Sequence, residues 1–413
     1  MAEAASIGES IGRLVRNDGG RLLANLISNL RDFQLAQDSL QDALESALHH
    51  WARNGLPDEP SAWLMRTARR KAIDRIRRAA RFRSKSAELA ALIELDSEPG
   101  PEPDLIPDER LGLIFTCCHP ALDRRTSVAL TLRSICGLTT EEIARAFVVT
   151  PDAMAQRLVR ARHKITKAGI AYEVPGPEAW GERLDAVLGA IYLTFNEGYA
   201  ASSDALLRPD LCEEAIRLCR VLLALRPDEP ETEGLLALML LHHARSPTRL
   251  DAGGVVVALE AQDRRRWDRA RIAEGAALVE TALRRFRPGP YQMQAAIAAL
   301  HAEAPSFAET GWHEIALLYA GLFALQQNPV FELNRLVALS YVAGPEASLA
   351  ELDGIAAPLA AYQPYHAVRA DFLARSGRAT EAEAAYDEAI RLAGTEAEQH
   401  FLRRKRGEAR EQE

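Results

Sequence analysis

Residues 137–165, with the sequence GLTTEEIARAFVVTPDAMAQRLVRARHKI, contain the start signals of two successive helices separated by a short turn. Thr139 and Glu142 have the spacing of a capping box, in which each side chain accepts a hydrogen bond from the backbone N–H of the other residue. Thr150 is a second helix cap, and Pro151 then occupies the first helical position, where its missing N–H breaks no hydrogen bond. Together with a preceding helix, these two helices predict a helix-turn-helix domain.

The second of these helices has an apolar face and a basic face. The residues expected to face the interior recur at helical spacing and are Met154, Leu158, Ala161 and Ile165. In a helix-turn-helix, the first residues of this helix contact base edges, and basic residues further along contact phosphates. A three-helix bundle with a solvated basic face is the structural alternative. The expected DNA-binding residues are Thr150, Gln156, Arg157, Arg160 and Lys164, with Gln156 and Arg157 at base edges and Arg160 and Lys164 at phosphates.

The basic residues are unevenly distributed in a chain whose formal net charge is −8. Residues 1–167 contain 25 Lys and Arg against 22 Asp and Glu, whereas residues 168–413 contain 25 against 36. The most basic segment is a predicted helix over residues 61–85, in which Asp74 is the one acidic residue. Charges of one sign repel each other unless a polyanion neutralises them, so nucleic acid is the expected partner. A solvated charged face is the alternative.

Length and composition limit the fold and the compartment. A chain of 413 residues predicts two or three domains, and its abundant Ala and Leu with few aromatic residues predict an all-α protein. The chain shows no secretory signal, and its apolar runs are far shorter than the ~20 residues that span a bilayer. We therefore expect a cytoplasmic protein with no membrane segment.

The odd number of cysteines does not suggest a disulfide framework. Adjacent Cys117 and Cys118 with His119 suit zinc poorly, because neighbouring side chains on a helix point about 100° apart. A zinc or redox role is the alternative to buried thiols. The cysteines expected to be buried thiols are Cys117, Cys118, Cys136, Cys212 and Cys219.

The first domain is expected to begin with two short helices over residues 6–30, broken at the glycine pair of NDGG. An amphipathic helix follows over residues 36–51. Its predicted apolar face contains Ala36, Leu40, Ala43, Leu44, Ala47, Leu48 and Trp51. Its opposite face contains Asp38, Gln41, Asp42 and Glu45.

The last part of the chain is expected to be a series of helices with a weak internal repeat. Small and large residues at Ala370, Leu373, Ala382, Tyr386 and Ala389 have the spacing of a tetratricopeptide helix pair. The same register fits Ala215, Cys219, Leu222 and Pro227, followed by Ala237 and Leu240. We therefore predict two small helical domains, joined by an acidic and proline-rich linker, and a C-terminal array of helical hairpins. The expected segments are residues 1–85, 86–107 (the linker), 108–170 and 171–413.

Two stretches resemble the extracytoplasmic-function family of sigma factors of bacterial RNA polymerase. ALESALHHWARNGLPDEPSAWLMRTARRKAIDRIRR, residues 43–78, is similar to the region-two helices of the family, and residues 137–165 are similar to its region four. DERLGLIFTCCHPAL, residues 108–122, and AIYLTFNEGYAASS, residues 190–203, resemble the subgroup with a long tetratricopeptide-like extension. With that extension, the resemblance covers nearly the whole chain.

The resemblance implies contacts with core RNA polymerase and with promoter DNA. Region two would contact the clamp helices of the β′ subunit through Asp38, Gln41, Asp42 and Glu45. It would also open the −10 promoter element, with Asn54, Asp58 and Glu59 holding an unstacked base and Arg66, Arg69, Arg70 and Arg77 on phosphates. Region four would contact the β flap and bind the −35 element as duplex. The family commonly has Lys where this chain has Ala155, so the promoter sequence does not transfer.

The C-terminal extension is expected to be a regulatory module that binds a protein or peptide, and whether it inhibits or is required stays open. We expect no catalytic residues, no metal and no cofactor. Asn196, Glu197 and Tyr199 lack a nucleophile–base pair, and the sequence contains no Gly-rich phosphate loop. Two alternatives have other functions: a helical scaffold that binds nucleic acid non-specifically without polymerase, and an enzyme built on the C-terminal helices.

Overall fold

The computed structural model describes residues 2–83, 109–147, 149–170, 172–199, 209–251, 257–394 and 396–411. Every regular element in these ranges is a helix, which confirms the predicted all-α class. The chain divides into two compact units, Met1–Leu193 and Thr194–Glu413, here called unit 1 and unit 2. The linker predicted for residues 86–107 lies outside the described residues.

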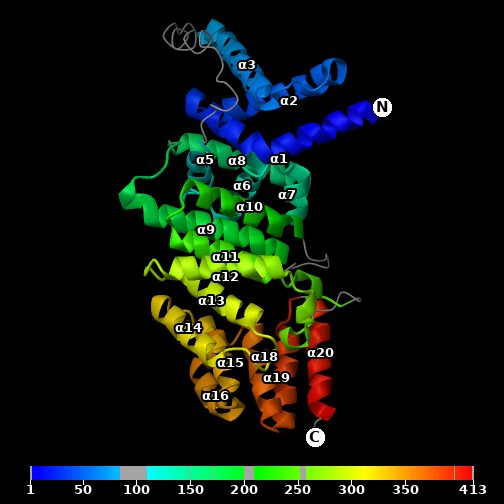
Figure 1. Ribbon diagram of the computed structural model, residues 1–413, viewed down its shortest axis with the longest axis vertical. Coiled ribbons are helices and arrows are strands. Elements are labelled where there is room, and N and C mark those ends of the chain that lie inside the picture. Colours follow the sequence, from blue (N-terminus) through cyan, green and yellow to red (C-terminus); the bar gives the residue numbers. More distant parts are fainter. Residues whose placement is uncertain are drawn as a thin grey trace. The chain divides into compact units, whose positions relative to one another are not determined.

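Unit 1 begins with three helices that pack against each other, α1 (Ala2–Leu30), α2 (Phe33–Asn54) and α3 (Pro60–Arg83) (Figure 1). Leu26, Trp51 and Leu64 are at the centre of their core and are almost fully buried. The Asp32 side chain caps α2 by accepting a hydrogen bond from the Leu35 backbone N–H at 2.9 Å. α2 ends at Gly55, whose φ of 81° is accessible to glycine at little cost.

The buried face of α2 differs from the predicted one at its edge. Ala43 and Ala47 are buried as predicted, whereas Leu44 is half-buried and Leu48 is 45% exposed. Each leucine follows one of these alanines and is therefore rotated about 100° around the helix. The apolar stripe is narrower than the sequence pattern predicts, and the inclusion of Leu48 in it is wrong.

The second half of unit 1 contains the predicted helix-turn-helix in four helices, α5 (Arg110–Cys117), α6 (Arg124–Ser134), α7 (Thr140–Ala146) and α8 (Pro151–Lys167). The capping box is confirmed. The Thr139 N–H donates to Glu142 Oε2 at 2.7 Å, and the Glu142 N–H donates to Thr139 Oγ1 at 3.1 Å. Thr150 Oγ1 accepts a hydrogen bond from the Ala153 N–H at 3.3 Å. The buried residues of α8 are the four that its spacing predicts.

α1 is one continuous helix, so the predicted break within residues 17–20 is wrong. Gly20 instead allows a close approach between two parts of unit 1. A Cβ atom at this position would lie 2.8 Å from the carbonyl oxygen of Ile135, in the segment after α6. In the same way, a Cβ atom on Gly137 would lie 2.9 Å from the carbonyl oxygen of Val15. Packing against another backbone, rather than a turn, explains the glycine in α1.

α9 (Pro177–Tyr199) begins within unit 1. The Trp180 and Phe115 rings have centroids 5.0 Å apart, and Arg183 Nη2 donates to the Phe115 carbonyl oxygen at 2.8 Å. The first half of α9 is therefore fixed to α5.

Unit 2 contains successive helices, of which α11 packs against both α12 and α13, and α19 packs between α18 and α20 (Figure 1). Its helices are α10 (Pro209–Leu225), α11 (Pro230–His243), α12 (Arg269–Leu283), α13 (Pro290–Glu303), α14 (Trp312–Leu325), α15 (Pro329–Ser340), α16 (Pro345–Leu352), α17 (Ala356–Leu359), α18 (Gln363–Arg375), α19 (Ala379–Leu392) and α20 (Glu396–Glu411). α18 and α19 form a hairpin with Gly377 at φ 73° in its turn. Of the eleven repeat positions predicted from the sequence, ten are buried, and Pro227, which follows α10, is exposed.

All five cysteines are free and buried, as predicted. Burial raises the pKa of Cys118 to about 11, so this side chain is a neutral thiol near pH 7. Among the described residues, no three His, Cys, Asp or Glu side chains come together as a metal site would require. Within those same ranges, none of the helices combines the length and the apolar character needed to cross a membrane.

Candidate nucleic-acid interface

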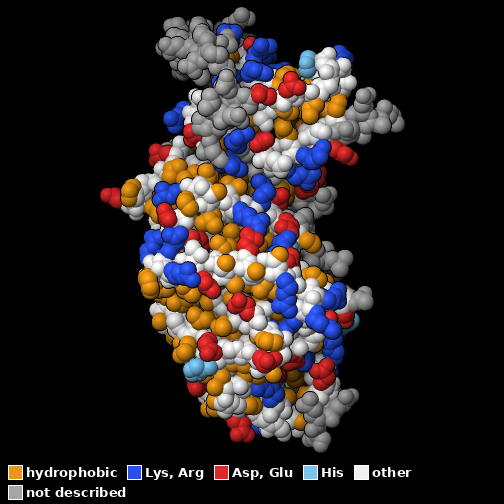
Figure 2. All heavy atoms as spheres, in the orientation of Figure 1, with side chains coloured by type: hydrophobic (Ala, Val, Ile, Leu, Met, Phe, Trp, Pro, Cys, Tyr) orange, Lys and Arg blue, Asp and Glu red, His pale blue; other side chains and the backbone are white. Residues whose placement is uncertain are grey.

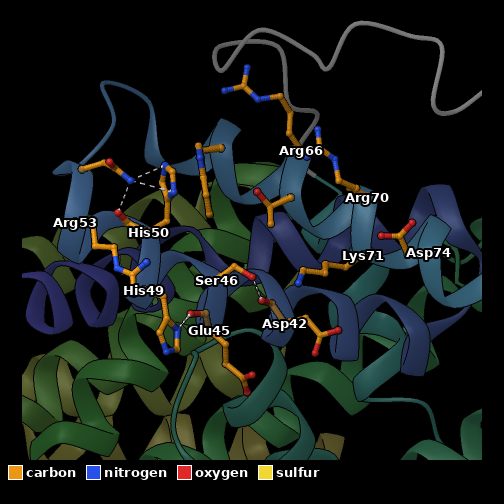
Figure 3. A pocket seen from close by; sticks show the side chains of 13 residues that line it. Asp42, Glu45, Ser46, His49, His50, Arg53, Arg66, Arg70, Lys71 and Asp74 are labelled. Atoms are coloured by element: carbon orange, nitrogen blue, oxygen red, sulfur yellow. Dashed lines mark hydrogen bonds between the residues drawn. The ribbon is translucent and has the colours of Figure 1, made fainter.

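A groove of about 1060 Å³ lies between α2 and α3 in unit 1 (Figure 3). α2 places two histidines, an arginine and two acids along it, and α3 places two arginines, a lysine and a tryptophan there. The lining side chains are Asp42, Glu45, Ser46, His49, His50, Arg53, Asn54, Trp63, Arg66, Thr67, Arg70, Lys71 and Asp74. Basic side chains beside an aromatic ring are the combination that binds single-stranded nucleic acid.

The aromatic part of the groove is held in place from the core. His50 stacks on Trp63 with ring centroids 5.5 Å apart and ring planes 21° apart. Trp51, which is fully buried, meets Trp63 edge-on with centroids 5.3 Å apart. The stacked pair of His50 and Trp63 is therefore a fixed aromatic surface at the groove wall, suited to stacking against an unpaired base.

The groove contains some of the predicted −10 contacts but not all. Asn54, Arg66 and Arg70 line it, whereas Asp58, Glu59, Arg69 and Arg77 do not. Asp58 and Glu59 lie exposed in the connection between α2 and α3. The Asn54 side-chain amide donates to the His50 carbonyl oxygen at 3.0 Å, one turn back in α2.

Eight groove residues are absent from the predicted contacts: Ser46, His49, His50, Arg53, Trp63, Thr67, Lys71 and Asp74. Two of them, His50 and Trp63, are separated by 13 residues in sequence and meet only because α2 and α3 pack side by side. The sequence signal that could indicate them is the alternation of aromatic and basic residues in HHWAR and SAWLMR.

The predicted polymerase-binding residues of α2 fall into two pairs. Arg75 of α3 contacts Asp42 Oδ2 with Nε at 3.0 Å and Nη2 at 2.8 Å, and its Nη1 lies 3.5 Å from Asp38 Oδ2. The hydrogen bond with Asp42 raises the pKa of the Arg75 guanidinium. Gln41 and Glu45 are exposed. Asp42 and Asp38 therefore also join α2 to α3, whereas Gln41 is exposed outside the groove and Glu45 is exposed along it.

On α8, the predicted DNA-binding residues differ in exposure. Gln156, Arg160 and Lys164 are exposed, as is the capping Thr150. Arg157 is half-buried, its guanidinium lies 5.9 Å from the Phe147 ring centroid, and its buried Nη1 has no hydrogen-bond partner. Packing against Phe147, which directly follows α7, therefore restricts the Arg157 side chain, and the sequence pattern does not indicate this contact.

A second, smaller pocket of about 280 Å³ lies between the start of α6 and the side of α8. Four cationic side chains line it: Arg125, Arg157, Arg160 and Lys164. Asp123, which caps α6, also lies there. Although burial opposes it, hydrogen bonds from the Thr126 side chain and backbone and the charge of Arg157 lower the pKa of the Asp123 carboxyl. A basic pocket at the start of a helix favours a phosphate.

Arg162 connects α8 to α2. Its Nη1 donates to Gln37 Oε1 at 2.6 Å, and its Nε is buried without a hydrogen-bond partner. Burial lowers the pKa of this guanidinium, which nonetheless stays charged near neutral pH. The helix-turn-helix thus contacts the α1–α3 bundle both through this hydrogen bond and through the close backbone contacts of Gly20 and Gly137.

Comparison with known families assigns three segments of the chain. Residues 14–82 match "Sigma-70 region 2", and residues 113–165 match "Sigma-70, region 4". Residues 183–283 match a "Family of unknown function (DUF6596)". The first match contains the α2–α3 groove, and the second contains the helix-turn-helix with its basic pocket.

A relative with similarity along nearly its whole length is an uncharacterized protein of Rhizobium meliloti (strain 1021). It is 45% identical over 384 residues, which cover 92% of this chain and 90% of that protein. No solved structure matches the chain. The chain therefore belongs to the family of this Rhizobium meliloti protein, and it is a sigma factor in which sigma-70 regions 2 and 4 are followed by the DUF6596 region.

Proposed function

We propose that this chain is a sigma factor of the extracytoplasmic-function type, which directs core RNA polymerase to specific promoters and is regulated by its own C-terminal unit. The observation that carries the proposal is the α2–α3 groove, where Trp63 stands between basic side chains of region 2. A stacking surface with phosphate-binding neighbours suits a melted −10 strand better than a duplex.

In this proposal the α2–α3 groove binds the −10 element, and α8 binds the −35 element. Asn54, Arg66 and Arg70 contact the −10 strand within the groove, and Asp58, Glu59, Arg69 and Arg77 contact it beyond the groove. On α8, Gln156 contacts a −35 base edge, Thr150 lies beside the DNA, and Arg160 and Lys164 contact phosphates. Arg157, predicted at a base edge, lines the basic pocket together with Arg160 and Lys164, so we propose that it contacts a phosphate.

Core polymerase is the proposed protein partner of unit 1. The exposed Gln41 and Glu45, with Asp38 and Asp42 beside them, would contact the β′ clamp, and the helix-turn-helix would contact the β flap. Polymerase would hold both DNA-binding domains at once, which makes the second DNA contact intramolecular and removes the need for tight binding by either domain alone. Such a protein acts in the cytoplasm.

The proposed domains are region 2 over residues 1–85, a linker over residues 86–107, region 4 over residues 108–170 and a regulatory extension over residues 171–413. The helical hairpins of the extension, such as α18 with α19, support a tetratricopeptide-like module. The proposed module has no catalytic role. Helical-pair arrays commonly bind proteins or peptides, and that is the role we propose here.

Run-off transcription with core polymerase and a library of genomic fragments tests the proposal. The full-length chain is compared with a chain ending at Tyr199, because α9 is fixed to α5 and an earlier end would expose the core of unit 1. Specific transcripts from either chain support the sigma activity, and the difference between the two gives the sign of control by unit 2. Silence from both, with non-specific DNA binding that weakens steeply with salt, would contradict it and favour a nucleic-acid-binding scaffold.

The role of the groove is tested separately with Trp63→Ala. Loss of one stacked base should weaken binding of the polymerase complex to fork-junction −10 DNA by about 1–3 kcal/mol. Binding to a duplex −35 fragment should be unchanged, which serves as the internal control. Equal effects on both fragments would mean that Trp63 only supports the fold.

A further inference from the structure

α14 of unit 2 has an unusual composition for a helix with an exposed face. Its sequence, WHEIALLYAGLFAL, is apolar on every side and contains one acidic residue, Glu314. A helix that is hydrophobic all round normally lies in an interior. Only three of its residues are buried, however, and Leu317 and Leu325 are 60% and 50% exposed. Leu317 and Leu325 are eight residues apart, so they lie on the same face.

This face borders an apolar groove of about 440 Å³ between α12, α13 and α14. Hydrophobic side chains gather over this part of unit 2 in the space-filling view (Figure 2). The apolar lining residues are Val279 and Leu283 of α12, Ala296, Ala299 and Leu300 of α13, and Leu317 and Leu318 of α14. Exposed apolar area of this kind on a folded protein usually marks a binding site.

Phe286 adds a second unusual feature at the end of α12. It follows the groove residue Leu283 by three positions and is 89% exposed. Its φ is 52°, in the left-handed region that bulky residues rarely adopt because of steric cost. A large aromatic side chain held in water by a strained backbone is typical of a contact residue rather than of a structural one.

The charges along the groove are acidic. Glu303 and Glu314 are its two charged lining residues, both are exposed, and neither forms an ion pair with another described residue. Arg284, which follows the groove residue Leu283 at the end of α12, is already paired with Glu280 at 3.1 Å. A partner that fills the groove would therefore gain by placing positive charges opposite Glu303 and Glu314.

We propose that the groove of α12, α13 and α14 binds an amphipathic helix of a separate protein, with large apolar residues on one face and lysine or arginine beside them. Helices with apolar residues at positions i, i+3 or i+4, and i+7 are the usual occupants of apolar grooves. A second copy of this chain fits less well. A two-fold contact places the same patch on both sides, which would bring each acidic groove against another acidic groove.

The inference rests on the proposed regulatory role of unit 2 and adds to it the chemistry of the partner. Its test uses binding rather than transcription, so failure of one does not imply failure of the other. A fluorescein-labelled helical peptide of leucine and lysine, with leucine at positions i, i+3, i+4 and i+7, is titrated with the full-length chain. A second peptide contains glutamate in place of every lysine.

The lysine peptide should bind at least about tenfold more tightly than the glutamate peptide. Leu317→Asp should weaken its binding by a similar factor, and the double variant Glu303→Lys with Glu314→Lys should reverse the preference between the two peptides. Val342→Asp is the matched control, because Val342 is also an exposed apolar residue of unit 2, 50% exposed, and does not line the groove. Val342→Asp should bind the lysine peptide with the same affinity as the unchanged chain.

Three results would overturn the proposal. One is equal binding of the two peptides, and another is binding that Leu317→Asp does not weaken. The third is a dimer in sedimentation equilibrium that Leu317→Asp dissociates, which would assign the groove to a second copy. Since Leu317 is exposed, circular dichroism should show unchanged helix content in Leu317→Asp. If this variant loses helix content, the double variant Glu303→Lys with Glu314→Lys tests the groove independently.

Discussion

Asp42 and Glu45 lie three residues apart on α2 but differ in what they contact. Asp42 is joined to Arg75 of α3 by two hydrogen bonds, whereas Glu45 is exposed. A charge reversal at Asp42 would place two guanidinium groups together, so the Asp42→Arg variant tests folding as well as binding. Glu45 is the better position at which to test contact with polymerase.

Glu45→Arg should abolish association with core polymerase without changing the free energy of unfolding, because no described ion pair is lost. Asp42→Arg should lower that free energy by about 1 kcal/mol, the upper range for a partly exposed ion pair. Pull-down of core enzyme and urea unfolding measure the two effects. If Glu45→Arg still binds core enzyme as the unchanged chain does, the assignment of this face is wrong.

Gln156 and Arg157 are neighbours on α8 and should differ in how they affect DNA binding. Gln156→Ala should cost about 1–3 kcal/mol at one −35 base pair and little at others, as loss of a base contact does. Arg157→Ala should weaken binding to all sequences equally, because its side chain lies in the pocket of Arg125, Arg160 and Lys164. Binding to a set of single-base −35 variants distinguishes the two. A loss confined to one base pair for Arg157→Ala would restore its predicted base contact.

The start of α7 depends on its capping box, which is a property of a single helix. Thr139→Ala removes the hydroxyl that accepts from the Glu142 N–H and should destabilise unit 1 by about 0.5–2 kcal/mol. Thr140→Ala is the matched control, because Thr140 is the first residue of the helix and not its cap. Chemical unfolding of both variants measures the difference. Equal stability of the two would mean that packing alone fixes α7.

Helix starts were the part of this fold that local chemistry could predict. The start of α7 at Thr139 and that of α8 at Thr150 and Pro151 depend on residues within one helical turn, so the local sequence is enough to predict them. The spacing of the apolar residues is enough to predict the buried face of α8. Gly20 shows the limit, because the same glycine pair is compatible with a turn or with a close approach. Only the position of Ile135, more than a hundred residues away, decides between them.

The α2–α3 groove likewise shows that the sequence of one helix does not predict contacts between two helices. Its arginines are evident as a run of like charges on α3, but the stack of His50 on Trp63 depends on how α2 and α3 are aligned. The narrowed apolar stripe that leaves Leu48 exposed depends on that packing as well. A pattern within one helix predicts which face is buried, and it does not predict which side chains of two helices meet.

For the molecule as a whole, the acid sensitivity of folding should come in part from unit 2. Burial and the charge of Arg245 lower the pKa of His242 to about 3 and that of His301 to about 4. In the unfolded chain both titrate near their ordinary value of about 6.5. Between these values the unfolded state binds more protons, so stability falls as the pH falls from about 6.5 towards 4.

Urea unfolding of the full chain at pH 7 and pH 5 measures this loss. His301→Gln should make the pH dependence shallower, because it removes one of the imidazoles whose pKa is lowered in the folded chain. His400→Gln, at an exposed position of α20, should leave it unchanged. An identical pH dependence in all three chains would show that other groups cause the acid sensitivity.

The close contacts at Gly20 and Gly137 have a consequence for how this protein can evolve. Within a helix, glycine is about 0.8–1.0 kcal/mol less favourable than alanine, so Gly20→Ala would strengthen α1 taken alone. The added methyl group would, however, push against the Ile135 carbonyl and separate two domains whose own cores it leaves intact. Glycine and alanine codons differ by a single nucleotide. A single nucleotide change at the Gly20 codon would therefore strain the contact between regions 4 and 2, although alanine suits the helix itself better.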